Sequence, residues 1–343
     1  MGSWVARYLG KLGAHVETRD LGPGRPNVVA VFDTVGKPAK TVVFAPHLDT
    51  VGVGGMTVPP FKLTAKGGRL FGRGSCDTKG PTAALFAALD RWSRSAERRR
   101  TSVRWIVAAT AGEEQGSLGA ESLCRGGLKA DFAIALEPTD LKVVTAAKGV
   151  LRVKVTLVGR AAHGSAPQRG VNAIYGLMPL ISEIRGGMSR WLASSEHPVL
   201  GRATVNLGNI AGGGELNIVP DKCTIGLDFR THPSCTGDAV LKRLRAAISA
   251  HARSASMEIV CNRPSFVADR AGEWARRVRR AGSGWATADW FCDANVFSAH
   301  GIPAVAFGPG SIHQAHTRDE FIGERELDLG ASAFLGILHS APV

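Results

Sequence analysis

The sequence predicts an α/β protein built on a mostly parallel sheet flanked by helices. Short apolar runs rich in β-branched residues occur at 28–32, 41–45, 103–109 and 131–136, and such runs are typical of strands buried on both faces. A helical pattern, PTAALFAALDRW, begins at Pro81 between the second and third runs. Because strands that alternate with helices usually pair in parallel, this succession predicts the fold class.

A change of pattern near residue 149 predicts a second domain inserted into the first. The strings VLRVKVTLVG, ATVNLGNI and CTIGLDFR alternate apolar and polar residues, which is typical of an antiparallel sheet with one exposed face. The first pattern returns with the apolar strand PAVAFG and a closing helix from Glu326. We therefore predict an α/β domain made of two segments and an α+β domain between them, with the boundaries 1–148, 149–263 and 264–343.

Composition excludes several classes of protein. The six cysteines are scattered and form no CxxC pair, which argues against a disulfide scaffold and a cysteine-only zinc site. The net charge is +13, but basic residues are spread along the chain and aromatic residues make up only 6%, so a solvated basic surface is a better interpretation than a nucleic-acid site. The sequence shows no apolar run of about 18 residues and no export leader. We therefore expect a cytoplasmic protein with no membrane or nucleic-acid partner.

Side chains that bind metals or move protons follow four of the predicted strands, and one more precedes the Pro81 helix. In chain order they are His47 and Asp49, Asp77, Glu113 and Glu114, Glu137, and His316. Because the carboxyl ends of parallel strands meet at one edge of a sheet, we expect these side chains to lie close together. Imidazoles and carboxylates suit zinc-type divalent ions, and a carboxylate count beyond the needs of one ion predicts two.

The side chains of this predicted metal centre can be given chemical roles from their residue types and spacing. Two neighbouring ions need a bridging ligand, and Asp77, on a turn flanked by glycines, can give one carboxylate oxygen to each. His47 and Asp49 are two residues apart, so in continued strand geometry they share a face and the Asp49 carboxylate can accept the imidazole N–H. Glycines around Glu113 and Glu114 permit a turn in which one of the pair binds metal and the other acts as a base.

Other interpretations of the same residues are weaker. A lone His47 is more often a hydrogen-bonded structural histidine, and a glutamate pair beside glycines is usually a solvated loop, but their joint placement at successive strand ends favours a site. A non-catalytic binding protein that kept this fold would not need a base in addition to its ligands. A nucleotide-binding enzyme would need FGRGSCDTKG as a phosphate loop, and this string matches neither GxGxxG nor GxxxxGK[ST].

Five strings carry a family resemblance across nearly the whole chain. PHLDTV, GRGSCDTKG, AGEEQGSLGA, ALEPT and QAHTRDEFI, in this order, resemble the dimetal amidohydrolase family of acetylornithine deacetylase, succinyl-diaminopimelate desuccinylase, aminoacylase and the glutamate carboxypeptidases. The resemblance implies a catalytic domain holding two Zn²⁺ ions per chain, with Co²⁺ or Mn²⁺ as substitutes. It also implies an inserted lid domain that forms a homodimer, and an N-acyl amino acid or short peptide as substrate.

The resemblance also implies roles for single residues. By that pattern His47 and Glu137 hold one metal, Glu114 and His316 hold the other, Asp77 bridges the two, and Glu113 is the general base. The implied reaction is hydrolysis of the amide bond of an N-acyl amino acid by a metal-bridged water. A dipeptidase or carboxypeptidase of the same family is the alternative, and an inactive binding homologue is a further one. Glu137, where some peptidase members have aspartate, favours the deacylase.

Further positions resemble the lid and substrate loops of this family. GRAAHGSAP is similar to the lid motif whose histidine, here His163, reaches the partner subunit's active site and stabilises the oxyanion. Similar strings place Asn217 and Arg230 at the substrate carboxylate, Gly310 in a substrate loop, and Asp293 at the acidic position of a threonine-aspartate motif.

Overall fold

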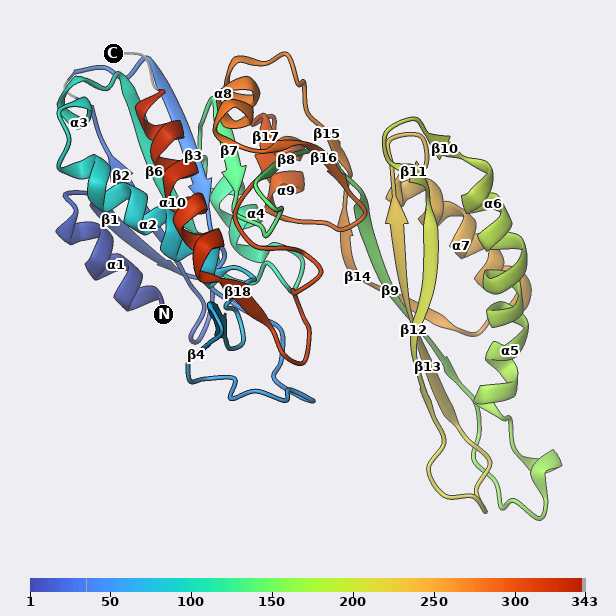
Figure 1. The fold of residues 1–343 in the computed structure, drawn as a ribbon. Coiled ribbons are helices and arrows are strands. Elements are labelled where there is room, and N and C mark those ends of the chain that lie inside the picture. The colour runs from blue at the N-terminus through green and yellow to red at the C-terminus, as the bar shows by residue number, and fades with distance from the viewer. Residues whose placement is uncertain (35, 341–343) are drawn as a thin grey trace. The chain divides into compact units, whose positions relative to one another are not determined.

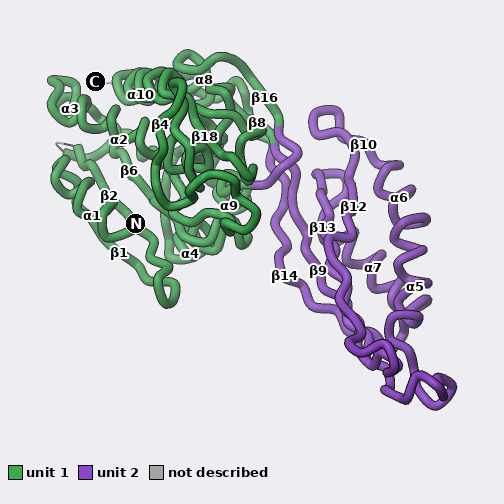
Figure 2. Tube along the Cα trace, turned by 60° about the horizontal axis from the view of Figure 1, so that its bottom comes forward, with its two compact units in different colours: residues 1–146, 267–287, 292–343 green, residues 147–266, 288–291 purple. Residues whose placement is uncertain are grey.

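The computed structural model describes residues 1–34 and 36–340, and the chain forms two compact units (Figure 2). Unit 1 comprises residues 1–146, 267–287 and 292–343, and unit 2 comprises residues 147–266 and 288–291. Each unit has its own hydrophobic core. The predicted fold class is confirmed, because a largely parallel sheet with helices and a second, antiparallel α+β unit are both present.

The larger sheet has the strand order β1-β2-β6-β3-β7-β17-β8-β15, with β16 paired to β8 (Figure 1). The strands are β1 (His15–Asp20), β2 (Pro26–Phe32), β3 (Lys40–Ala45), β6 (Val103–Ala109), β7 (Phe132–Ala135), β8 (Lys142–Ala147), β15 (Phe266–Val267), β16 (Gly284–Ala288) and β17 (Ala304–Ala306). β6, β3, β7 and β17 are parallel, whereas β1, β2 and β8 are antiparallel to their neighbours. The carboxyl ends of the four parallel strands therefore meet at one edge.

Helices cover both faces of this sheet. They are α1 (Gly2–Lys11), α2 (Lys79–Ser93), α3 (Glu97–Arg100), α4 (Leu118–Arg125), α8 (Glu273–Ala281), α9 (Asp293–Ala299) and α10 (Glu324–His339). Residues of α1, α2, α8 and α10 share one core with Val42 and Phe44 of β3, and α2 lies beside α10 (Figure 1). α4 and α9 pack together, and α9 contacts β7 and β17. Because successive side chains of a strand point to opposite faces, β3 is apolar and buried on both faces from Val42 to Ala45.

A small sheet brings two distant segments of unit 1 together. Its strands, in the order β18-β5-β4, are β4 (Thr64–Lys66), β5 (Arg69–Phe71) and β18 (Phe321–Gly323). β18 and β5 are antiparallel, and Phe321 pairs with Phe71. The chain just after β5 therefore runs beside the chain just before β18.

Unit 2 is an antiparallel sheet packed against helices. Its strands, in the order β12-β13-β9-β14, are β9 (Gly149–Val158), β12 (Thr204–Gly212), β13 (Lys222–Thr231) and β14 (Ser256–Arg263), and β10 (Glu196–His197) pairs with β11 (Gly201–Arg202). The helices are α5 (Ala173–Glu183), α6 (Ser189–Ser194) and α7 (Gly237–His251), with a 3₁₀ turn at Pro167–Arg169 and a π-helical turn at Ile184–Met188. Buried side chains alternate along β13, as the period-two pattern predicts.

No helix in the described part of the chain has the length and apolar character that a membrane crossing requires.

The packing of α10 on the sheet gives a direct test of the fold. Phe334 is buried and meets the rings of Phe44 and Phe307 edge-on, at centroid distances of 5.9 and 5.7 Å. Phe334→Ala leaves a cavity between helix and sheet, so we expect a loss of about 3–5 kcal/mol in the free energy of unfolding, measured by urea denaturation. Leu329→Ala, at a half-exposed position of the same helix, is the control and should cost less than about 0.5 kcal/mol. Equal losses in the two variants would contradict this packing.

Candidate metal centre

The site residues predicted in unit 1 gather where the parallel strands end. His47 follows β3, Glu113 and Glu114 follow β6, Glu137 follows β7, and His316 lies in the loop after β17. Asp77 lies between β5 and α2, two residues before the helix begins. The gathering follows from the topology, because parallel neighbours end on the same side of the sheet.

Asp77 lies between two histidines from distant parts of the chain. Its Oδ1 is 2.9 Å from His47 Nε2, and its Oδ2 is 3.2 Å from His316 Nε2. Glu114 Oε1 lies 3.0 Å from the same His316 nitrogen. Ligand-type atoms of His47, Asp77 and Glu137 lie within 4.8 Å of one another, and so do those of Asp77, Glu114 and His316. The described residues thus contain two groups that could each hold a metal ion and that share Asp77.

The Asp49 carboxylate has different partners from the one the sequence predicts. The His47 Nδ1–H donates to the carbonyl oxygen of Asp49 at 3.0 Å, and the nearer carboxylate oxygen is 3.7 Å away. That carboxylate instead accepts the backbone N–H groups of Gly112 and Glu113 through Oδ1, at 2.9 and 3.1 Å, and of Glu114 through Oδ2, at 3.2 Å. The reason is local geometry: Gly112 has φ +76°, and the turn it starts presents consecutive N–H groups to one acceptor.

Neighbouring carboxylates raise the pKa of both histidines. Burial acts to lower the pKa of His47, but the hydrogen bond and charge of Asp77 and the neighbouring glutamates outweigh it and hold the pKa well above its usual range. Hydrogen bonds with Asp77 and Glu114 raise the pKa of His316 to about 10. Burial acts to raise the pKa of Asp77, yet the two histidines keep it well below its usual range. The carboxylates around the two imidazoles thus favour positive charge at this place.

The pKa values of two further carboxyl groups at the centre are raised instead of lowered. Burial raises the pKa of Glu113 well above its usual range, opposed by His47 and reinforced by neighbouring carboxylates. Burial likewise raises the pKa of Glu137, and the charges of Asp77 and Glu113 add to it. A carboxyl group whose pKa is raised toward neutrality is suited to accept and return a proton.

The structure does not support a contact between Asp293 and a substrate. Asp293 is 1% exposed, and its Oδ2 accepts the Thr110 hydroxyl at 2.7 Å. Burial also raises the pKa of its carboxyl group. Thr110 directly follows β6, so the Asp293 carboxylate is hydrogen-bonded to the chain at the end of that strand. Gly310 has φ +86°, and a Cβ there would lie 2.8 Å from Cys76 Sγ, so packing against the Asp77 loop explains the glycine.

His163 and Asn217 lie on neighbouring segments of unit 2. Gly164 N–H donates to the Asn217 carbonyl oxygen at 2.6 Å. The His163 Nδ1 accepts the Ser165 N–H at 3.1 Å, so the neutral ring carries its proton on Nε2. His163 and Asn217 are both exposed.

Arg230, on β13 of unit 2, is held by a carboxylate of its own strand. Its Nε and Nη2 donate to the two Asp228 oxygens at 2.7 and 3.3 Å. Arg152 of the paired strand β9 donates to the same carboxylate at 3.0 Å. Asp228 therefore fixes the direction of the Arg230 guanidinium and engages two of its five N–H groups.

One buried carboxylate beside the centre is not predicted from the sequence. Glu320, four residues after His316, is fully buried, and both its oxygens accept hydrogen bonds from residues 73–77. The sequence signal is weak, since an acidic residue in HTRDEF is usually solvated. The pairing of β18 with β5 is what turns it inward.

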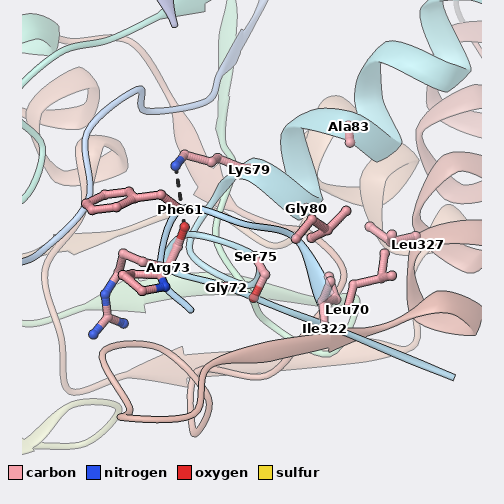
Figure 3. Close-up of a pocket in the computed structure, with 12 residues that line it drawn as sticks. Phe61, Leu70, Gly72, Arg73, Ser75, Lys79, Gly80, Ala83, Ile322 and Leu327 are labelled. Atoms are coloured by element: carbon pink, nitrogen blue, oxygen red, sulfur yellow. Dashed lines mark hydrogen bonds between the residues drawn. The ribbon is translucent and has the colours of Figure 1, made fainter. Parts of the chain in front are cut away.

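An apolar pocket of about 360 Å³ borders the chain that carries Asp77 (Figure 3). One wall of the pocket is formed by Leu70, Ile322 and Leu327. The Arg73 side chain points away from this wall. None of the predicted metal ligands lines this pocket.

Comparison with known proteins identifies the family. Residues 43–340 match the profile of Peptidase family M20/M25/M40. An acetylornithine deacetylase of Edwardsiella ictaluri (strain 93-146) is 30% identical over 328 residues, which are 93% of this chain and 84% of that protein. The chain belongs to the M20/M25/M40 family. The resemblance to a family of metal-dependent hydrolases that the sequence shows is therefore confirmed.

Two further known proteins are similar to this chain over most of its length. An acetylornithine deacetylase of Myxococcus xanthus is 32% identical over 337 residues, which are 90% of this chain and 82% of that protein. The crystal structure of the M20 family metallo-carboxypeptidase Sso-CP2 from Sulfolobus solfataricus superposes with a TM-score of 0.82 over 98% of this chain and 93% of that one. Its sequence identity is 19%, so it shows the shared fold.

The donor set of this M20/M25/M40 chain fits divalent ions of the zinc type. Each group offers one imidazole nitrogen and two carboxylates, which are zinc ligands, and three protein ligands leave positions open for water or substrate.

The contacts of Asp49 predict a support role for its carboxylate. In Asp49→Asn, the amide nitrogen cannot accept a backbone N–H, so at least one of the three bonds to the Gly112–Glu114 turn is lost. We expect metal affinity to fall by about 10- to 100-fold, measured by competition with a chelator. Asp131→Asn is the matched control. The Asp131 carboxylate also accepts a backbone N–H, which is that of Thr41 in β3. Unchanged affinity in Asp49→Asn would contradict the support role.

Proposed function

We propose that this chain is a dimetal amidohydrolase that removes the acyl group from the nitrogen of an N-acyl amino acid. The observation that carries the proposal is the Asp77 carboxylate, which directs one oxygen to His47 and the other to His316. The relatives named acetylornithine deacetylase match at least 90% of the chain, which supports N-acetyl amino acids, N-acetylornithine first, as the substrate class.

Two zinc ions are assigned to the two groups that share Asp77. The ligands proposed for one ion are His47, Asp77 and Glu137, and those for the other are Asp77, Glu114 and His316. Co²⁺ and Mn²⁺, which accept the same nitrogen and oxygen ligands, are the expected substitutes. When bound, the ions would polarise the amide carbonyl and acidify a water molecule.

Glu113 is the proposed general base. Its carboxylate oxygen takes a proton from the attacking water and returns it to the nitrogen of the leaving amine. The raised pKa of Glu113 suits both steps, because its carboxyl group holds a proton closer to neutral pH than an ordinary glutamate does. The bond from its backbone N–H to Asp49 supports the orientation of the base.

Unit 2 is proposed to supply the remaining substrate contacts. The Nε2–H of His163 is a donor suited to the oxyanion that forms at the amide carbonyl. Arg230 retains N–H groups beyond those that Asp228 engages, and they suit the substrate carboxylate. Asn217, on the segment next to His163, is assigned to the same carboxylate.

A homodimer formed through unit 2 is part of the proposal. β12 lies at the edge of the unit 2 sheet, so its outer N–H and C=O groups are open for pairing. Leu207 and Ile210 of this strand are 37% and 51% exposed. A long, partly apolar edge strand favours a second copy of the chain as the partner, related by a twofold axis.

Turnover of a substrate series tests the reaction class. Enzyme loaded with Zn²⁺ or Co²⁺ should hydrolyse N-acetylornithine and other N-acetyl amino acids faster than N-succinyl amino acids or dipeptides. Glu113→Gln should retain two metal ions but lose turnover by about 10²- to 10⁴-fold, because the amide cannot accept the proton. Gln115→Ala, at an exposed position of the same turn, is the control. Turnover confined to dipeptides, or unaffected by Glu113→Gln, would rule out the proposal.

Mixing of inactive subunits tests the shared site. If His163 completes the partner's active site, His163→Ala and Glu113→Gln are each nearly inactive, since loss of one oxyanion donor alone costs about 10²- to 10³-fold. A mixed dimer has one site with an intact Glu113 and a donated His163, so up to half of its sites should work. Recovery is measured after subunit exchange, which fluorescence energy transfer between labelled chains verifies. No recovery after verified exchange would place His163 outside the partner's site.

A further inference from the structure

Glu320 is a buried carboxylate that is not among the proposed metal ligands. It lies four residues after His316 and directly before β18, and none of its surface is exposed. A charged group at such a position requires partners for both oxygens, because an unpaired buried charge is strongly destabilising. The identity of those partners determines what the residue does.

Both oxygens of Glu320 bind the loop that carries Asp77. Oε2 accepts from Arg73 Nη1 at 2.6 Å and from the Gly74 N–H at 3.0 Å. Oε1 accepts the N–H groups of Cys76 at 2.9 Å and of Asp77 itself at 3.0 Å. Charge-assisted hydrogen bonds of this kind are about twice as strong as neutral ones. One carboxylate therefore fixes the backbone of the loop up to the residue that is proposed to bridge the ions.

Arg73 extends the same set of contacts to a third segment. Its Nε donates to the carbonyl oxygen of Gly52 at 3.2 Å, in the loop that follows His47. The Gly72 N–H also donates to the Glu320 carbonyl oxygen at 3.1 Å. The Arg73 and Glu320 side chains are 5% and 1% exposed, so water does not weaken the pair. The contacts thus join the segments that carry His47, Asp77 and His316.

The two ligand segments that Glu320 joins need such a connection. His316 has φ +62°, a left-handed conformation that a residue with a side chain rarely adopts, and its side chain is 52% exposed. Packing alone therefore holds this imidazole weakly, and the chain around it must fix its place. Glu320 is the point at which the His316 segment is tied to the interior.

We propose that Glu320 is a positioning residue that holds the Asp77 loop against the His316 segment at the spacing required by two ions sharing one carboxylate. The inference rests on the proposed function, because it takes Asp77 and His316 as ligands. It assigns Glu320 no contact with substrate or metal. Its effect passes through the backbone N–H of Asp77 and the chain between His316 and β18.

Cobalt binding to the full chain tests the inference. In Glu320→Gln the side chain keeps its shape, but the amide nitrogen cannot accept, so two of the four hydrogen bonds are lost. We expect one of the two Co²⁺ binding steps in calorimetry to weaken by about 10- to 100-fold. The visible absorption of bound Co²⁺, which reports ligand geometry, should change as well. Wild-type binding steps and spectrum in Glu320→Gln would overturn the inference.

Control variants separate positioning from simple destabilisation. Val278→Ala lowers stability in the same core without touching the loop, and should leave both Co²⁺ steps and the spectrum unchanged. Arg73→Met combined with Glu320→Gln removes the unpaired guanidinium, so stability should recover in part while Co²⁺ binding stays weak. Recovery of wild-type binding in this double variant would mean that Glu320 only neutralises Arg73, and would overturn the inference.

A second variant covers the case in which Glu320→Gln does not fold. Glu320→Asp keeps the negative charge opposite Arg73, but its carboxylate is one methylene shorter and cannot reach all four donors. The same weakened Co²⁺ step and altered spectrum are expected. If the wild-type chain itself bound fewer than two ions, the proposed function would fail together with this inference. If the wild type bound two and Glu320→Asp matched it, the positioning role alone would fail.

Discussion

A single carboxylate, that of Asp77, lies between two imidazoles, and the arrangement of unit 1 keeps it there. His47 is brought to it by the end of β3, and His316 by the loop that follows β17, far along the chain from the Asp77 loop that follows β5. A buried carboxylate is stable as an ion when hydrogen bonds or positive charge favour it, and the two histidines lower the pKa of Asp77 in this way. The same geometry is what two cations would use, with one carboxylate oxygen directed to each.

Carboxylates outside the proposed set of ligands also hold the loops around this centre. Asp49 binds three N–H groups of the turn that carries Glu113 and Glu114, and Glu320 binds three N–H groups and Arg73 in the loop before α2. Chain that continues past the end of a strand no longer has ladder partners for its N–H groups, so other acceptors must satisfy them. A carboxylate can accept several such bonds at once. Acidic residues that do not bind metal thus define where the acidic ligands lie.

The concentration of negative charge links stability to chemistry. Burial raises the pKa of Glu113 and Glu137, and the charge of Asp77 disfavours the ionisation of both. Bound divalent ions would offset this negative charge. Glu113, whose pKa is raised by burial, lies beside the proposed ligands, in the place that the proposed general base requires.

Local pattern determined the regular elements of this protein. The apolar run of β3 and the helical patterns of α2 and α10 were legible in the sequence, and both helices begin within two residues of the predicted positions Pro81 and Glu326. The order of strands, helices and glycine-flanked acidic residues also predicted which side chains would gather at one edge. β1 was missed, because the string HVETRD of this edge strand is mostly exposed and shows no apolar alternation. These features depend on neighbours in the chain.

Only the tertiary structure decided how the gathered side chains are held. The Asp49 carboxylate binds the Glu113–Glu114 turn rather than His47, Asp293 lies buried behind β6, and Glu320 reaches Arg73 across 247 positions of sequence. Each of these outcomes depends on which hydrogen-bond donors lie near the carboxylate once the strands have paired. That is a property of two segments meeting in space, and neither segment carries it alone.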